Sequence, residues 1–242
     1  MKRSFLYCTF LLLILSLISA CGPSPEKQLA TAIENGDFAT VRTLIEQGVD
    51  VNTRLAAGRT ILMHAAENGE KDIVETLLGK SVNVDTKDMN GHAALYLAAS
   101  KGHTDVVALL LAGKANANLT DSEGKTSLIA AAEGGHLDTV KALHDGGANI
   151  SKSDNSSRSA LFHSAIAGKA DVVRYLIENQ VDVDQQDFDG CTALVASAAL
   201  GNAEVVEALL QGGAKVNSID KEGCTALIRS EEHTSELQSR QS

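Results

Sequence analysis

Residues 88–120 read DMNGHAALYLAASKGHTDVVALLLAGKANANLT, and they contain one complete structural unit. Its opening Asp and Gly are residues that favour a turn. The next segment, 94–100, carries Leu and Ala on one helical face, which predicts a short helix. Gly102 suits the end of that helix, because glycine accepts a left-handed backbone without a Cβ clash. A second helix is predicted from about Thr104 to Ala112, so the unit is a turn followed by two helices.

The same unit recurs along the chain with a period of 33 residues. A fixed period of this kind is typical of a solenoid, in which each repeat packs on its neighbours. Isolated helices shorter than about 12–15 residues are only marginally stable in water. We therefore expect the stack to be the folding unit. Three sets of residues keep the register: Asp88, Asp121, Asp154, Asp187 and Asp220; Leu62, Leu95, Leu128, Leu161, Leu194 and Leu227; and Gly36, Gly69, Gly102, Gly135, Gly168 and Gly201.

The recurring pattern Gly-x-Thr-x-Leu, Ala-Ala-x-x-Gly-His, Val-Val-x-x-Leu-Leu resembles the ankyrin repeat, and the resemblance covers about residues 26–228. It implies an all-α solenoid of stacked helix-turn-helix units with β-hairpin-like connecting loops. The first unit lacks the turn motif and resembles an N-terminal cap. The predicted units are 26–54 (the cap), 55–87, 88–120, 121–153, 154–186, 187–219 and a truncated unit, 220–228.

The chain departs from the ankyrin pattern at informative places. The usual proline at the start of the first helix is missing from every unit. Thr139 and His144 replace apolar residues in the fourth unit, and Ser157 replaces a turn glycine in the fifth. We expect the fourth and fifth units to be the least stable part of the stack.

The N-terminus has the features of an export signal. Lys2 and Arg3 precede an apolar run over residues 5–18, which is shorter than the roughly 20 residues of a membrane-spanning helix. The sequence Ile18-Ser19-Ala20-Cys21 resembles a bacterial lipobox, in which the cysteine is acylated after cleavage. We predict a signal peptide over 1–20, a lipidated Cys21 and a short linker over 21–25. The alternative is ordinary secretory cleavage, with Cys21 as a bystander.

These features predict an exported lipoprotein of the cell envelope, held to the membrane by lipid on Cys21. Gly22 follows the cysteine, whereas Asp at that place is associated with inner-membrane retention in Gram-negative lipoproteins. If the source cell is Gram-negative, we expect the protein on the outer membrane, facing the periplasm.

The C-terminal end breaks the register. Residues 229–239, RSEEHTSELQS, have no Ala pair, no Gly and no Val/Leu face, and they resemble the conceptual translation of a common sequencing adapter. We predict that 229–242 is an artefactual tail and that the natural chain completes the seventh repeat. The alternative is a natural polar tail. A stack without its C-terminal cap should expose apolar surface at this end.

The sequence offers no convincing catalytic constellation, metal site or cofactor motif, so we expect no enzyme activity, no cofactor and no small-molecule substrate. His103 and His136 occupy a repeat position where His is a routine structural residue. Cys191 and Cys224 lie one repeat apart, beyond the Cα separation of about 7 Å that a disulfide allows, so we predict free thiols. The net charge of −10 disfavours nucleic acid as a partner.

A protein partner would bind the concave surface, through the turn tips and the exposed side of each first helix. Most residues there are small or polar. Four stand out because hot spots favour aromatic and Arg residues in apolar surroundings: Arg158, Ile166, Phe188 and Leu200. Phe188 is the strongest candidate, since nothing in the repeat demands an aromatic residue at a turn tip. The alternative is that Phe188 folds back on its own hairpin or covers the missing seventh repeat.

The leading functional hypothesis is therefore a lipid-tethered scaffold or adaptor, monomeric, that binds a protein partner. The second is a dedicated inhibitor or immunity-type protein for one envelope or secreted enzyme. An enzyme is the least supported reading. Fold alone does not identify the partner, because repeat proteins share a fold while their surfaces diverge.

Overall fold

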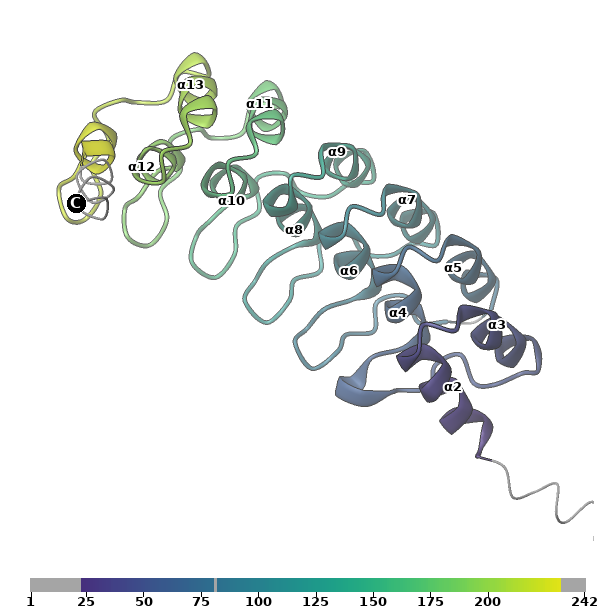
Figure 1. The fold of residues 1–242 in the computed structure, drawn as a ribbon. Helices are drawn as coiled ribbons and strands as arrows, with labels where there is room; N and C mark the ends of the chain where they lie inside the picture. The colour runs from purple at the N-terminus through teal and green to yellow at the C-terminus, as the bar shows by residue number, and fades with distance from the viewer. Residues whose placement is uncertain (1–22, 81, 232–242) are drawn as a thin grey trace, which may run out of the picture. The chain divides into compact units, whose positions relative to one another are not determined.

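The computed structural model describes residues 23–80 and 82–231 (Figure 1). The predicted signal peptide, Cys21 and residues 232–242 of the predicted tail lie outside this part. The chain divides into two compact units, Met1–Thr53 and Arg54–Ser242.

The described part of the first unit is a helix pair, α2 (Pro25–Glu34) and α3 (Phe38–Glu46). Pro25 suits the first turn of α2, where its missing N–H would have no helical partner. The Oδ1 atom of Asp37 caps α3 by accepting a hydrogen bond from the Thr40 N–H at 3.1 Å. Leu29 and Val41, one from each helix, are fully buried.

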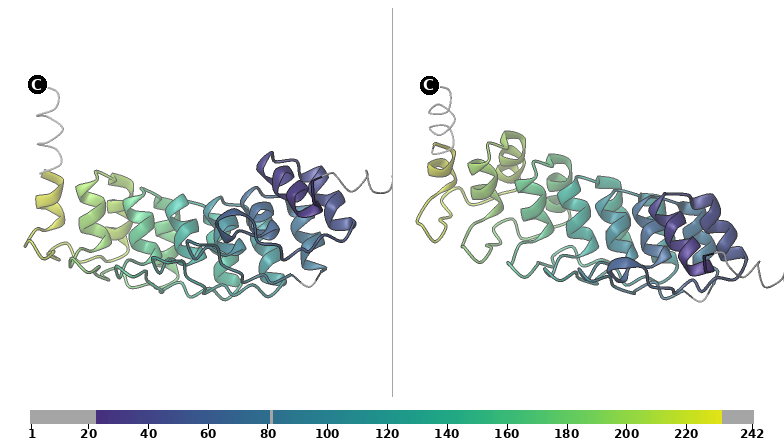
Figure 2. Two further views of the ribbon diagram at one scale, coloured as in Figure 1. Left: turned by 90° about the horizontal axis from the view of Figure 1, so that it is seen from below. Right: turned by 60° about the horizontal axis from the view of Figure 1, so that its bottom comes forward.

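The second unit is a stack of helix pairs (Figures 1 and 2). The even-numbered helices pack on one another in one layer and the odd-numbered helices in a second layer. The predicted all-α arrangement of stacked helix pairs is confirmed. The 3₁₀ turn η2 (Ala56–Gly58) precedes the stack, and helical residues 226–231 follow it. The pairs are α4 (Ile61–Glu67) with α5 (Lys71–Leu78), α6 (Ala94–Ser100) with α7 (Thr104–Ala112), α8 (Ser127–Gly134) with α9 (Leu137–Asp145), α10 (Ala160–Ile166) with α11 (Ala170–Glu178), and α12 (Ala193–Ala199) with α13 (Ala203–Gln211).

The loops between the helix pairs are hairpin-like. Three isolated antiparallel bridges close them, at Thr120–Thr126, Ser153–Ser159 and Gln186–Thr192, and the described residues contain no longer strand pairing. Each loop tip is tied to the preceding one by a backbone hydrogen bond; for example, the Ser122 N–H donates to the Asn90 carbonyl at 3.0 Å. These bonds keep successive tips in register.

Small residues hold the even-numbered layer close. The Ala pairs at 65/66, 98/99 and 131/132 are all fully buried. Without bulky side chains between them, adjacent helices approach closely, and a larger residue would overpack the layer. Leu110 and Leu143 of the second layer are also fully buried, so each repeat covers the next.

The predicted structural histidines contact the preceding repeat. The Nε2 atom of His103 lies 3.0 Å from the Glu67 carbonyl, and that of His136 lies 3.3 Å from the Ser100 carbonyl. Each contact satisfies a carbonyl near the end of the preceding repeat's first helix, which agrees with the structural role inferred from the repeat position.

A polar contact between side chains lies between the fourth and fifth repeats. Helices α9 and α11 approach each other less closely than the other neighbours in their layer. The His144 and Tyr175 side chains meet between them, with Nδ1 and the phenol oxygen 2.9 Å apart. Ser157 and Gln180 of the fifth repeat have left-handed backbone angles, φ 63° and 60°, which are unfavourable for residues other than Gly; the second and third repeats have one such residue each, Ala57 and Lys114. These features match the expected weak region, whose lower stability stays a prediction.

The fifth repeat also contains a buried His–Asp contact. The His163 Nε2 atom lies 2.8 Å from Oδ2 of Asp154, the first residue of its own turn. The two side chains are 5% and 6% exposed. The other ring nitrogen, Nδ1, lies 3.9 Å from a Glu133 carboxylate oxygen of the preceding repeat and has no hydrogen-bond partner. This pair therefore acts in packing, beneath the surface that a partner would touch.

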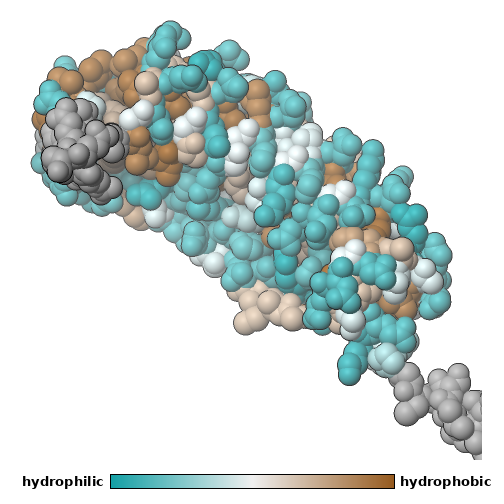
Figure 3. All heavy atoms as spheres, in the orientation of Figure 1, coloured by the Kyte–Doolittle hydropathy of each residue, from teal (hydrophilic) through white to brown (hydrophobic). Residues whose placement is uncertain are grey.

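Apolar side chains are exposed at the C-terminal end of the stack, as expected there (Figure 3). The largest exposed fractions belong to Leu227 (65%), Val216 (55%) and Ile219 (54%).

Candidate protein-binding surface

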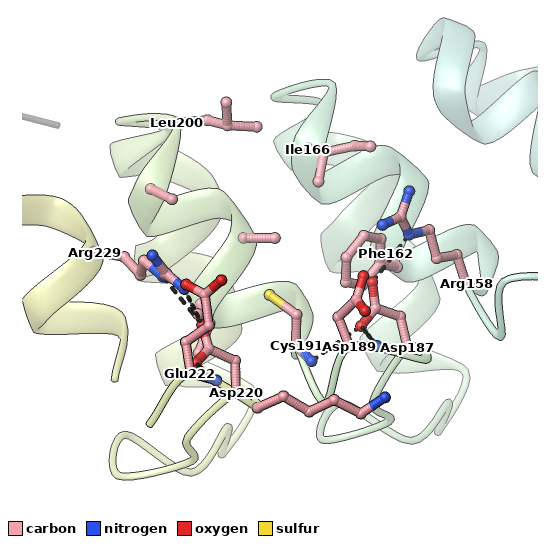
Figure 4. A pocket seen from close by; sticks show the side chains of 14 residues that line it. Arg158, Phe162, Ile166, Asp187, Asp189, Cys191, Leu200, Asp220, Glu222 and Arg229 are labelled. Carbon is pink, nitrogen blue, oxygen red and sulfur yellow. Dashed lines mark hydrogen bonds and ion pairs between the residues drawn. The ribbon is translucent and has the colours of Figure 1, made fainter. Parts of the chain in front are cut away.

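A groove of about 460 Å³ lies between helices α10 and α12 and the turn loops of the fifth to seventh repeats (Figure 4). Its floor is apolar and its rim is charged. The floor residues are Phe162, Ile166, Val195, Ala196, Ala199 and Leu200, and the rim residues are Arg158, Asp187, Asp189, Asp220, Lys221, Glu222 and Arg229, with Cys191 between the two. A hollow with an apolar floor and a few polar groups is the usual character of a binding site.

The repeats before the groove carry a column of basic side chains on this face. The residues stand four positions after the start of each turn, and we call them the basic column: Arg59, His92, Lys125 and Arg158. Each faces carboxylates. Arg59 lies 2.7 Å from Glu67, and Lys125 lies 3.1 Å from Glu133.

Three members of the basic column bridge to the turn Asp of the next repeat; for Arg59, Nε lies 3.9 Å from Oδ2 of Asp88. The Arg158 Nε atom lies 3.0 Å from Asp187, and its guanidinium lies 5.2 Å from the centre of the Phe162 ring. The His92 Nε2 atom lies 3.8 Å from Asp121. The column therefore ties neighbouring turns together and fills the space along the inner face.

The column stops at Cys191, and the groove opens there. Cysteine is short and uncharged, so it does not reach Asp220, the turn Asp of the next repeat. Arg229 takes that role instead, with Nη2 and Nε at 2.7 and 3.0 Å from Asp220 Oδ2. Ala196 and Ala199 stand where the preceding repeat has His163 and Ile166, which deepens the hollow.

The thiol in this groove is not set up as a nucleophile. Burial, followed by the nearby carboxylates of Asp187 and Asp220, raises the pKa of Cys191 to about 11. The reactive form of cysteine is the thiolate, which is scarce at neutral pH for such a group. Cys191 and Cys224 are both free thiols.

The structure brings three of the four predicted binding residues to the groove. Arg158, Ile166 and Leu200 line it, and Leu200 is 53% exposed. Phe188 does not line the groove; it lies at the neighbouring turn tip with 62% of its surface exposed. The sequence did not indicate Phe162, which forms the floor. The break in the basic column at Cys191 is the signal that could have located the groove.

Replacing Phe188 with Ala should weaken binding of a protein partner about tenfold or more, if the turn tip is a hot spot. The melting temperature should change little, because the side chain is mostly exposed. Met89→Ala is the matched control, since Met89 stands at the same repeat position and is 80% exposed. A marked loss of helicity or melting temperature in Phe188→Ala would instead show a structural role.

The described part of the chain has neither a metal cluster nor a membrane-spanning helix. Within it, no group of three or more His, Cys, Asp or Glu side chains is placed to hold a metal ion. Among residues 23–80 and 82–231, no helix has the length and apolar character needed to cross a membrane.

The comparisons with known proteins agree with the architecture. The chain is similar in structure to the human ASB11 ankyrin repeat domain, with a TM-score of 0.76 and 26% identity over 84% of this chain and 90% of that one. It is also similar in fold to the ankyrin repeat domain of Bcl-3, a member of the IkappaB protein family, with a TM-score of 0.71 and 23% identity over 84% and 92% of the two chains. No curated protein matches it in sequence. The family model for ankyrin repeats matches residues 29–121, 109–187 and 181–237, so this chain belongs to the ankyrin repeat family.

Proposed function

We propose that this chain is an adaptor of the bacterial cell envelope, tethered through lipid on Cys21, which binds a protein partner in the groove between α10 and α12. Ankyrin repeat domains are generally protein–protein interaction modules and typically lack enzymatic activity. The observation that carries the proposal is the groove itself, because its apolar floor and charged rim have the composition of a protein-binding site.

The tether rests on the leader sequence and on the short distance to the folded part. Helix α2 begins at Pro25, only four residues after Cys21. A lipid on Cys21 would therefore hold the repeats close to the membrane, and each buried CH₂ would contribute about 0.8 kcal/mol to anchoring. We propose a monomer with no cofactor, no catalytic role and no nucleic-acid partner, on the outer membrane facing the periplasm in a Gram-negative cell.

Changing Cys21 to Ser should release the protein from the membrane. Cells expressing the chain with its native leader are fractionated after labelling with radioactive palmitate. The wild type should carry label and sediment with membranes, whereas Cys21→Ser should do neither. Cys191→Ser is the matched control and should behave as the wild type. Membrane retention of unlabelled Cys21→Ser would contradict the lipid tether.

The partner is identified in the same cells by crosslinking from the groove. A photoreactive amino acid at Leu200 should capture a protein, and one at Glu75 on α5, outside the groove, should not. A partner captured by the wild type and lost with Cys21→Ser would support the tethered adaptor. One enzyme captured tightly regardless of the tether would instead indicate the dedicated inhibitor or immunity-type protein. Capture from Glu75 alone would overturn the groove as the binding surface.

A further inference from the structure

Building on the proposed docking function, we propose that the groove selects a partner segment that carries an arginine next to apolar side chains. The arginine would sit between Asp220 and Glu222, which we call the guanidinium seat. In the free chain Arg229 occupies this seat. The apolar neighbours would lie on the strip formed by Ile166, Ala199 and Leu200.

The seat exists because the basic column is interrupted. In the fifth repeat, Arg158 meets Asp187, the turn Asp of the next repeat. The equivalent of Arg158 one repeat later is Cys191, which cannot meet Asp220. The Asp220 side chain is only 7% exposed, and its Oδ1 atom accepts hydrogen bonds from the Glu222 and Cys224 N–H groups at 3.0 and 2.9 Å. Its Oδ2 atom is the one that a cation contacts, and that cation comes either from another segment of this chain or from a partner.

The geometry around Arg229 shows what the seat recognises. Its Nε and Nη2 atoms both contact Asp220, at 3.0 and 2.7 Å, and Nη2 also contacts Glu222. One planar group thus bridges two carboxylates, which suits the fork of a guanidinium better than the single nitrogen of lysine. Burial would raise the pKa of Asp220, but hydrogen bonds from the Cys224 N–H and Arg229 lower it overall, so the seat stays anionic at neutral pH.

The contact made by Arg229 is replaceable. Its side chain is 23% exposed, and that of Glu222 is 74% exposed, so a partner can reach the seat from solvent. Asp220 and Glu222 precede residue 229, so both carboxylates lie outside the predicted artefactual tail. With Arg229 removed, four carboxylates and two cations line the groove: Asp187, Asp189, Asp220 and Glu222 against Arg158 and Lys221.

The test uses the mature chain and three fluorescent peptides that differ only at one central position between leucines, which is Arg, Lys or Glu. Binding is measured by fluorescence anisotropy. Arg229→Ala vacates the seat and should bind the Arg peptide about tenfold more tightly than the wild type does. The Lys peptide should bind Arg229→Ala more weakly than the Arg peptide, and the Glu peptide more weakly still.

A second variant fills the groove. Cys191→Arg restores the basic column and should place a guanidinium on Asp220, so the Arg peptide should bind it about tenfold more weakly than the wild type. Cys224→Arg is the matched control, because Cys224 has the same repeat position but does not line the groove. It should bind as the wild type does. Thermal melts followed by circular dichroism check that each variant is folded.

Three results would overturn the inference: no binding of the Arg peptide to Arg229→Ala at concentrations up to about 1 mM, equal binding to Cys191→Arg and Cys224→Arg, or a preference for the Glu peptide. The proposed function is judged separately, by the partner crosslinked in cells. If that partner binds Cys191→Arg undiminished, the adaptor function stands and the guanidinium seat falls. If the peptides behave as expected but no partner crosslinks, the seat stands and the adaptor function falls.

Discussion

Replacing Asp154 with Ala should lower the free energy of unfolding by about 3 kcal/mol or more, because it leaves several buried hydrogen-bond donors without their acceptor. The Asp154 carboxylate accepts hydrogen bonds from the His163 ring at 2.8 Å, the Ser156 N–H at 2.8 Å and the Arg158 N–H at 2.9 Å. Removing it leaves three donors without that acceptor, and His163 is only 4% exposed. The loss should fall on the fifth repeat, where the stack is already expected to be weakest.

Urea unfolding followed by circular dichroism measures this loss. Asp189→Ala is the control, because Asp189 is an exposed turn residue whose removal should change the unfolding free energy by about 0.5 kcal/mol or less. The double variant Asp154→Ala/His163→Leu should recover part of the stability, since it removes the orphaned ring together with its partner. A loss below about 1 kcal/mol in Asp154→Ala would show that the pair contributes little.

The same pair predicts a dependence on acid. Burial would raise the pKa of Asp154, but hydrogen bonds from the Arg158 N–H, His163 and the Ser156 N–H lower it below the ordinary value of 3.8. A carboxylate with a lowered folded-state pKa stabilises the protein above its unfolded-state pKa, and this contribution is lost as the pH falls through the folded-state value. The wild type should therefore lose stability below about pH 4, and Asp154→Ala should lose less over the same range.

The repeat architecture was predictable because its signal is averaged over many copies. The period of 33 residues set the helix positions, and α6 and α7 match the helices predicted from residues 88–120. Every first helix lacks the usual proline at its start, which would preset the backbone angle φ there. In the structure the side chains of Thr60, Thr126 and Thr192 cap the N-termini of α4, α8 and α12 and so stabilise the helix starts that lack proline. The Thr is part of the sequence motif, but its capping hydrogen bond depends on the backbone geometry.

The groove was only partly predictable, because it arises from small residues. Large residues such as Phe188 and Arg158 can be recognised in a sequence as candidate binding residues. Cys191, Ala196 and Ala199 contribute to the groove because their side chains are small and leave it open. Their effect appears only when the neighbouring repeats are in place. The contact of Arg229 with Asp220 could not be predicted either, because residue 229 follows the point where the repeat pattern ends. Whether Phe188 takes part in binding stays a prediction.

The second large stability effect is expected at Gly91, where a turn glycine faces the next repeat. Its φ is +81°, and a Cβ atom there would lie 2.7 Å from the Ser122 backbone nitrogen and 3.0 Å from the Asp121 Cα. These are backbone atoms, so they cannot turn aside as a side chain would. The same Ser122 N–H donates to the Asn90 carbonyl at 3.0 Å, which is the bond that ties the two turn tips. A methyl group at residue 91 would force this bond apart.

A substitution at Gly58 measures the cost of the left-handed backbone without the steric contact that a Cβ atom would make at Gly91. Gly58 holds the same repeat position with φ +72°, but its nearest neighbour for a Cβ atom is the flexible Arg54 side chain at 3.4 Å. Gly58→Ala should lower the unfolding free energy by about 1–2 kcal/mol, the cost of a left-handed backbone. Gly91→Ala should lose about 1–3 kcal/mol more from overpacking. Gly190, 3.3 Å from the Lys221 nitrogen, should fall between them. Equal losses at all three sites in urea unfolding would mean that the turn tips yield freely, and that their backbone bonds do not hold the stack in register.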